Sequence, residues 1–190
     1  MKRTLLLLTL TGAAVLGGVA YANRYALEHM VMQRMHGMGM GHMGGMGMAH
    51  MFKGVDTTPA EETELRAMFD GHTQITRSVE NLPKGIRTVT ETSNPALREQ
   101  MVSHVIGMID RVDQGRDPKV TIQSLTLDIL FKNRALIVTE MEPTETGIIV
   151  TQTSDDAETV AALQKHAAEV SDLAARGIVS AQEAMMARHH

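Results

Sequence analysis

Between residues 58 and 177 the spacing of apolar residues changes from a helical period to an alternating one and back. The segment from Thr58 has a proline at the first helical position and a glutamate at the third, which is a typical helix start. Leu65, Met68 and Phe69 then recur at the spacing of one helix face. The pattern predicts a helix that begins at Thr58 and packs its apolar face on a core.

Two short stretches after this helix alternate with a period of two, as strands do. Ile75, Arg77 and Val79 share one face of the first stretch, and residues 87–91 form the second after a turn at residues 82–85. Threonine and charged residues occupy many of the remaining positions. We therefore expect an antiparallel sheet with one solvated face and helices on the other.

A longer helix closes this unit, and the unit then recurs. The long helices are expected from Asn94 to Gly115 and from Asp155–Asp156 to Gly177. His166 lies 62 residues after His104, but the Thr-Ser pair at 92–93 recurs only 61 residues later, so we expect a slip of one residue before the second long helix.

Two copies of a unit are two halves of one domain, because a solenoid needs at least three. The sequence thus predicts an α+β fold with a pseudo-twofold axis. A duplicated helix-strand-strand-helix unit, with halves at about 58–115 and 120–177, would form a four-stranded antiparallel sheet with helices on one face.

The chain before the duplicated region divides into two segments. Residues 1–22 combine Lys2 and Arg3 with an uncharged apolar run that ends in small residues, as bacterial secretory signals do. The run is close to the shortest bilayer span, so an uncleaved membrane anchor is the alternative. In either case we expect residues 23–55 and the duplicated domain, residues 56–190, to lie in the periplasm.

Residues 23–55 contain a tract whose composition is unlike that of any folded element. Between residues 29 and 51 nine methionines and four histidines are interleaved with six glycines, and from Gly37 onward this leaves neither helix propensity nor core residues. We expect the tract to be flexible when empty. Its candidate metal ligands are His29, Met30, Met32, Met35, His36, Met38, Met40, His42, Met43, Met46, Met48, His50 and Met51.

The side chains of this tract favour copper. Thioether sulfur is a soft ligand that selects Cu(I), and imidazole binds copper in both oxidation states as well as Zn(II). Arg34 is the only charged residue of the tract, so Ca²⁺ and Mg²⁺ find no carboxylate there. The alternative interpretations are that the tract is a spacer or that its methionines consume oxidants. The tract resembles those of periplasmic copper-resistance and copper-carrier proteins, and this resemblance implies copper handling.

A second set of candidate ligands lies on the predicted long helices. His104 flanks an apolar helix face and has Met108 four residues later, so both side chains can reach one soft metal ion or serve as axial ligands of a haem. His166 is the repeat mate of His104, and a pseudo-twofold axis would bring the two histidines toward each other. A histidine beside an apolar face also serves as a core-edge residue that bonds the backbone, and this alternative stays open.

Composition and the lack of motifs exclude several classes of function. Without cysteine there is no disulfide, no thiolate metal site, no thiol nucleophile and no covalent haem attachment. The net charge of −4 becomes −6 when Lys2 and Arg3 leave with the signal, and an acidic chain with few aromatic residues is a poor ligand for nucleic acid. No protease, hydrolase or phosphate-loop motif is present, and no dinucleotide glycine motif follows a strand, because the glycines of the Met/His tract precede no helix; we therefore expect no enzyme.

The duplicated region also resembles a family of exported bacterial proteins with a duplicated domain, through residues 82–93 and 153–156, and this resemblance implies no activity.

The sequence predicts a periplasmic protein that captures, buffers or delivers Cu(I). The alternatives are a haem-binding or electron-transfer module that uses His104 with His166 or Met108, and an envelope interaction domain with no metal role. Copper ions are the expected partner; another envelope copper protein and a homodimer stay open, and contact with a membrane is expected only through an uncleaved anchor. The C-terminal residues Met185, Met186, His189 and His190 are expected on a frayed, exposed end that could add copper ligands.

Overall fold

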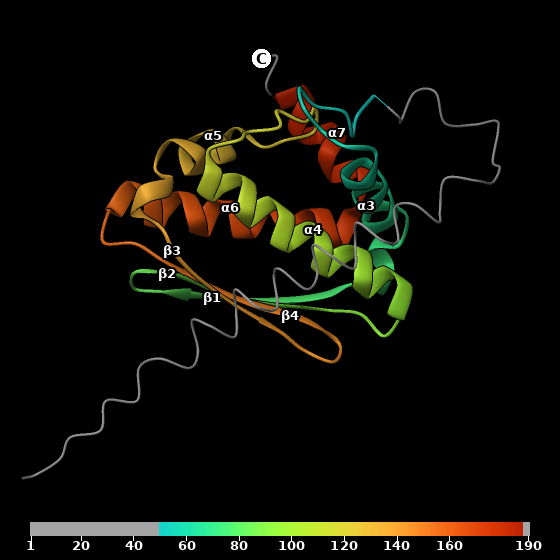
Figure 1. Ribbon diagram of the computed structural model, residues 1–190, viewed down its shortest axis with the longest axis horizontal. Coiled ribbons are helices and arrows are strands. Elements are labelled where there is room, and N and C mark those ends of the chain that lie inside the picture. The colour runs from blue at the N-terminus through green and yellow to red at the C-terminus, as the bar shows by residue number, and fades with distance from the viewer. Residues whose placement is uncertain (1–49, 188–190) are drawn as a thin grey trace, which may run out of the picture. The chain divides into compact units, whose positions relative to one another are not determined.

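The computed structural model describes residues 50–187, which form a four-stranded antiparallel sheet with helices over one face (Figure 1). The elements follow one another as α3 (Pro59–Asp70), η1 (His72–Gln74), β1 (Thr76–Leu82), β2 (Gly85–Glu91), α4 (Pro95–Gln114), α5 (Leu125–Lys132), η2 (Arg134–Leu136), β3 (Val138–Pro143), β4 (Gly147–Thr153), α6 (Ala157–Arg176) and α7 (Ile178–Ala187). The predicted α+β fold of two helix-strand-strand-helix units is confirmed.

The helices begin and end at the signals that the sequence contains. Thr58 and Glu61 form a capping box, in which the Thr58 backbone N–H donates to Glu61 Oε2 at 2.7 Å. Asn94 Oδ1 accepts two backbone N–H groups at the start of α4. The long helices α4 and α6 end at Gly115 and Gly177, where φ is 68° and 58°, a region that favours glycine.

From the end of their first helices onward the two halves repeat at a distance of 62 residues, whereas the start of α5 lies 66 residues after that of α3. The N-cap residues of α4 and α6 are Asn94 and Asp156, so Thr92 corresponds to Ser154 and the predicted slip of one residue is wrong. The hydroxyl groups explain why alignment of the two Thr-Ser pairs by residue identity gave the wrong register. Thr92 Oγ1 accepts the N–H of Asn94 at 3.2 Å and Ser154 Oγ accepts that of Asp156 at 3.1 Å, so either residue type makes the same turn.

A pseudo-twofold axis passes through the middle of the sheet. The strand order is β1-β2-β4-β3, so the two central strands come from different halves. Thr88 of β2 pairs with Val150 of β4, which is its own repeat mate. Each long helix packs on strands of the other half, an arrangement that we call the exchange of the long helices: α6 packs over β1 and β2, and α4 packs over β4. Each half therefore covers part of the sheet of the other.

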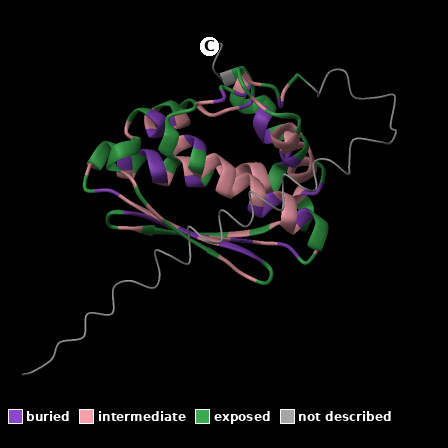
Figure 2. Cartoon of the chain, viewed as in Figure 1, coloured by how far each residue is buried: buried purple, intermediate pink, exposed green. Residues whose placement is uncertain are grey.

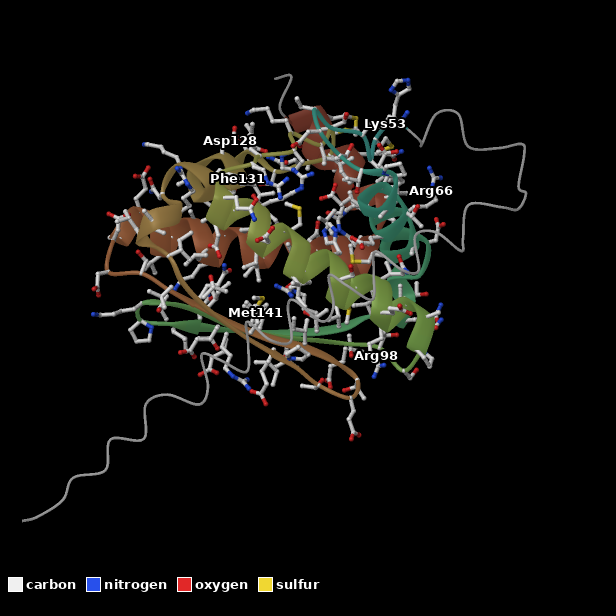
Figure 3. All side chains as sticks on the ribbon, viewed as in Figure 1. Lys53, Arg66, Arg98, Asp128, Phe131 and Met141 are labelled. Carbon is white, nitrogen blue, oxygen red and sulfur yellow. The ribbon has the colours of Figure 1, made fainter. Side chains whose placement is uncertain are left out.

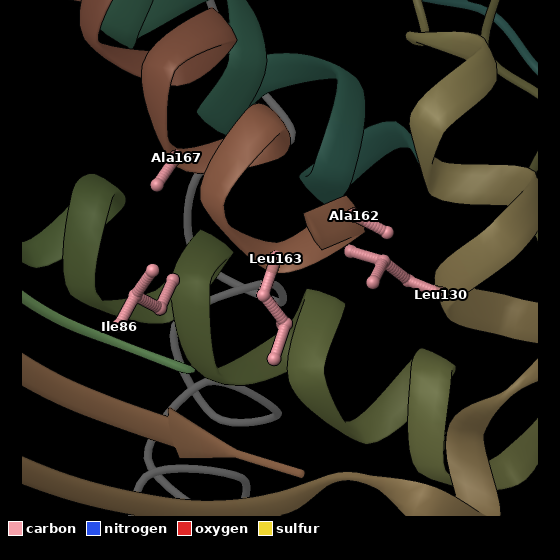
Figure 4. Packing of buried hydrophobic residues seen from close by; sticks show 5 residues of the cluster. All are labelled: Ile86, Leu130, Ala162, Leu163 and Ala167. Carbon is pink, nitrogen blue, oxygen red and sulfur yellow. The ribbon is translucent and has the colours of Figure 1, made fainter. Parts of the chain in front are cut away.

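Side-chain contacts join the exchanged elements. The guanidinium of Arg98 near the start of α4 donates to the carbonyl of Glu145 in the turn between β3 and β4 (Figure 3). Buried residues gather on the sheet and on the helix faces turned toward it (Figure 2). One cluster joins β2, α5 and α6 (Figure 4) and consists of Ile86, Leu130, Ala162, Leu163 and Ala167.

The second buried cluster includes residues from before the predicted start of the domain. Phe52 is 1% exposed and packs with Ile122 and Ala181, and its ring centroid lies 5.2 Å from that of Phe69. Met51 packs against the same cluster. Met51 and Phe52, which the sequence grouped with the tract, therefore pack with the domain.

The C-terminal end is more ordered than the sequence suggested. Residues 178–187 form α7, and Met185 packs against the second cluster, whereas Met186 is exposed. The expectation of a frayed end is therefore wrong for α7, while His189 and His190 lie outside the described residues. Between residues 50 and 187, no helix combines the length and the apolar character that crossing a membrane requires.

Candidate functional site

A cavity of about 770 Å³ lies between the long helices α4 and α6, above the sheet. Its walls are mostly apolar side chains of these helices and of α3 and α5, and its floor is formed by β1, β2 and β4. This volume is within the range of pockets that bind small organic molecules and cofactors. The charged, histidine and methionine side chains that line it are Met68, His72, Arg77, Met101, His104, Met108, Lys165, His166, Glu169, Asp172, Arg176 and Glu183.

The first half of the cavity contains a histidine beside a buried carboxylate. His104 Nδ1 on α4 lies 4.0 Å from Glu64 Oε2 on α3, and Glu64 is only 4% exposed. The hydroxyl of Ser103 donates to Glu64 Oε1 at 2.6 Å, which fixes the carboxylate. Metal-ligating histidines commonly have a carboxylate beside one ring nitrogen and use the other nitrogen as the ligand.

The second half makes the same pairing from different positions. His166 Nδ1 lies 3.8 Å from Glu169 Oε2, and both residues are on α6. The hydroxyls of Ser124 and Thr126 donate to Glu169 at 2.5 and 2.8 Å. Thr126 is the repeat mate of Glu64. The carboxylate beside the histidine therefore lies on the first helix of the unit in one half and on the second, long helix in the other. Each half thus sets a histidine beside an acid.

The protonation of these groups suits a ligand role for His104. Burial lowers the pKa of His104 to about 4, although the charge of Glu61 acts in the opposite direction. The imidazole is therefore neutral near pH 7, and a neutral imidazole has the lone pair that metal binding needs. Burial alone would raise the pKa of Glu169, but His166 nearby and the hydroxyls of Ser124 and Thr126 lower it to about 2.

The structure brings the candidate ligands of the long helices to one cavity. His104 and Met108 line it from α4, and His166 lines it from α6. Within residues 50–187, however, no three His, Cys, Asp or Glu side chains form a group that could hold a metal ion. Any metal bound here would therefore need thioether ligands or ligands of its own, as an iron porphyrin has.

Most of the Met/His tract lies outside the described residues. This applies to His29, Met30, Met32, Met35, His36, Met38, Met40, His42, Met43, Met46 and Met48. His50 is exposed, and its carbonyl accepts a hydrogen bond from the Thr121 hydroxyl at 3.2 Å. Met51 is partly buried in apolar packing, so its thioether is less available than that of a free chain.

His72 also lines the cavity, but its contacts are those of a helix end. His72 Nδ1 lies 3.2 Å from the carbonyl of Ala174 in the last turn of α6, and its ring packs against Gly177. Arg134, the repeat mate of His72, packs against Gly115 at the end of α4 in the same way. Basic side chains stabilise helix C-termini through the last carbonyls and the helix dipole.

Arg77 is the cationic side chain on the floor of the cavity. Its Nη1 donates to Thr90 Oγ1 on the neighbouring strand at 2.6 Å. Its Nε is buried and has no hydrogen-bond partner among the described residues. Burial lowers the pKa of Arg77 to about 10, so the guanidinium stays charged at neutral pH.

Glu64, Glu169 and Arg77 were not predicted as site residues from the sequence. The signal for Arg77 was present, because the alternating pattern places it on the same strand face as Ile75 and Val79, where a charge is unusual. The two glutamates gave no such signal, since the repeat aligns Glu64 with Thr126 and Glu169 with a glycine.

Comparison with models of protein families, with curated proteins and with solved structures gives no match for this chain. The two resemblances described for its tract and its duplicated region therefore stay predictions. What the protein does is inferred from the chemistry of its own residues.

Proposed function

We propose that the protein binds copper, preferentially Cu(I), through the Met/His tract between residues 29 and 51, and that it captures, buffers or delivers the metal in the periplasm. One observation carries this proposal: thirteen thioether and imidazole side chains lie within 23 residues of a chain that has no cysteine. Such ligands bind soft ions without a thiolate, and thioethers need no deprotonation.

The described residues support separate roles for the tract and the domain, with copper binding assigned to the tract. Phe52 is buried directly after the tract, and exposed His50 lies where the two join. Residues 50–187 offer no three-residue His, Cys, Asp or Glu group for a metal. Tight copper binding is therefore expected from the tract, and removal of the methionines from Met30 to Met48 should leave the domain folded.

The test is competition for Cu(I) against a chromogenic chelator. In one variant the eight methionines from Met30 to Met48 become leucine, which keeps the length of the tract. In the control, Met141→Leu and Met186→Leu change two exposed methionines of the domain. We expect the tract variant to lose most of its competition and the control to lose none. Equal competition by all three proteins would refute the proposal.

A second candidate function is haem binding in the cavity between α4 and α6. It is favoured by the two histidines that line this apolar space, each beside a carboxylate, and by the neutral state of His104. Imidazole and thioether side chains are both axial ligands of haem iron.

Titration with haemin tests this second function. The measurement is made in the tract variant with His29, His36 and His42 also changed to glutamine, so that exposed His50 is the one histidine of the tract left to bind haemin. A Soret band is expected, and it should be lost in His104→Gln or His166→Gln and kept in His50→Gln, which changes an exposed histidine. A band of equal strength in all of these variants would exclude the cavity as the haem site.

A further inference from the structure

Arg77 differs from the other deeply placed arginine of the domain in having no acidic partner. Arg111 is 2% exposed and binds Glu61 and Asp56 through its guanidinium, at 2.5 and 2.8 Å. Arg77 forms no ion pair with a carboxylate of the described residues, and its buried Nε donates to none of them. A buried cationic donor without an acceptor is costly, and such a group is usually explained by a ligand or a bound ion.

The fold itself does not require a charge at this position. The repeat mates of Arg77 and Thr90 are Thr139 and Gln152, and Gln152 Nε2 donates to Thr139 Oγ1 at 3.2 Å. The same cross-strand contact is thus made without charge in the second half. The guanidinium is an addition of the first half only, on the floor of the cavity.

The acids near the cavity are already engaged. Glu169 accepts from Ser124 and Thr126, while Asp172 and Glu183 pair with Arg176. Lys165 also lines the cavity, but its side chain is 70% exposed and lies 3.9 Å from Glu169. Arg77 is therefore the lining cation that has no carboxylate partner among the described residues and is available to an anion from outside the chain. The walls above it are aliphatic and thioether side chains, among them Val105, Met108, Ile109 and Val170.

We propose that this cavity binds an aliphatic monocarboxylate, with the carboxylate on the Arg77 guanidinium and the hydrocarbon chain between α4 and α6. The apolar walls favour the chain, because burial of apolar surface is favourable. The guanidinium supplies a charge-assisted hydrogen bond to the head group. The ligand is distinct from the copper of the tract, so the two proposals can fail independently.

Dodecanoate is the probe, and its binding to the full-length metal-free protein is measured by calorimetry. Arg77→Gln keeps an amide that can donate to Thr90 but removes the charge. Arg87→Gln is the matched control, because Arg87 is exposed on the outer face of the same sheet. We expect Arg77→Gln to weaken dodecanoate binding about tenfold or more and Arg87→Gln to leave it unchanged.

Two further measurements distinguish the contribution of the carboxylate head group to binding from that of the hydrocarbon chain. Dodecanol lacks the carboxylate and should bind the wild type and Arg77→Gln equally and weakly. Val170→Phe adds a ring to the wall of the cavity and leaves the Arg77 side chain unchanged. It should abolish dodecanoate binding while thermal unfolding shows a folded protein. The proposal is overturned if dodecanol binds as tightly as dodecanoate, if Arg77→Gln binds as the wild type does, or if Val170→Phe has no effect.

Discussion

At the scale of single residues, Arg111 shows how the domain stabilises a buried charge. Its guanidinium donates to both carboxylate oxygens of Glu61, to Asp56 and to two backbone carbonyls. These bonds tie α4 to the start of α3 and to the segment before it. A buried charge is tolerated when it is paired and fully hydrogen-bonded, and removal of one partner is strongly destabilising.

Glu61 should therefore make stability depend on pH. Burial alone would raise its pKa, but hydrogen bonds from Arg111 and Thr58 lower it from the ordinary 4.5 to about 2. A lowered pKa gives stability that is complete above pH 4.5 and is lost as the pH falls from 4.5 toward 2. Denaturant unfolding at a series of pH values measures this loss.

Glu61→Gln separates the charge from the cap, because glutamine can still accept the Thr58 N–H. We expect it to reduce the free energy of unfolding at pH 7 by about 3 kcal/mol, the cost of breaking a buried ion pair. The loss between pH 4.5 and 2 should become smaller in the variant. Glu145→Gln, at an exposed turn residue, is the control. If both variants follow the wild-type pH profile, the role given to Glu61 is contradicted.

At the scale of elements, local signals were sufficient to predict the helices and strands of both halves. The Thr58 capping box, the Asn94 cap and the glycines at 115 and 177 lie where the structure uses them. The spacing of the repeat was misjudged by one residue because threonine and serine make the same turn at positions 92 and 154.

The Asn94 cap leads to a test at this scale. Asn94 Oδ1 accepts the N–H groups of Ala96 and Leu97, which otherwise lack partners within the helix. We expect Asn94→Ala to lower the free energy of unfolding by about 1 kcal/mol. Ser93→Ala, at the exposed neighbouring position, should change it by less than about 0.5 kcal/mol. Equal effects in chemical denaturation would contradict the assignment of the cap.

At the scale of the whole molecule, the site depends on contacts that no local pattern encodes. The exchange of α4 and α6 between the halves places His104 and His166 in the lining of one cavity, while their meeting in one site stays a prediction. Their acidic neighbours Glu64 and Glu169 come from unrelated positions of the repeat, so comparison of the two halves could not find them. Burial of Phe52 was missed because a single phenylalanine after a glycine-rich tract has no periodicity.

Tract and domain therefore have separate expected roles: copper capture before residue 52, and an apolar cavity between residues 65 and 184 that is available to an organic ligand. Loss of either activity should leave the other intact, because no residue of the tract that the structure describes lines the cavity.

The most direct measurement is the copper content of protein exported from copper-loaded cells, determined by elemental analysis for the wild type and for the variant with leucine in place of the eight methionines from Met30 to Met48. We expect the wild type to carry copper and the variant to have lost most of it. If both carry the same amount, or if the wild type carries none, the tract is not a copper site.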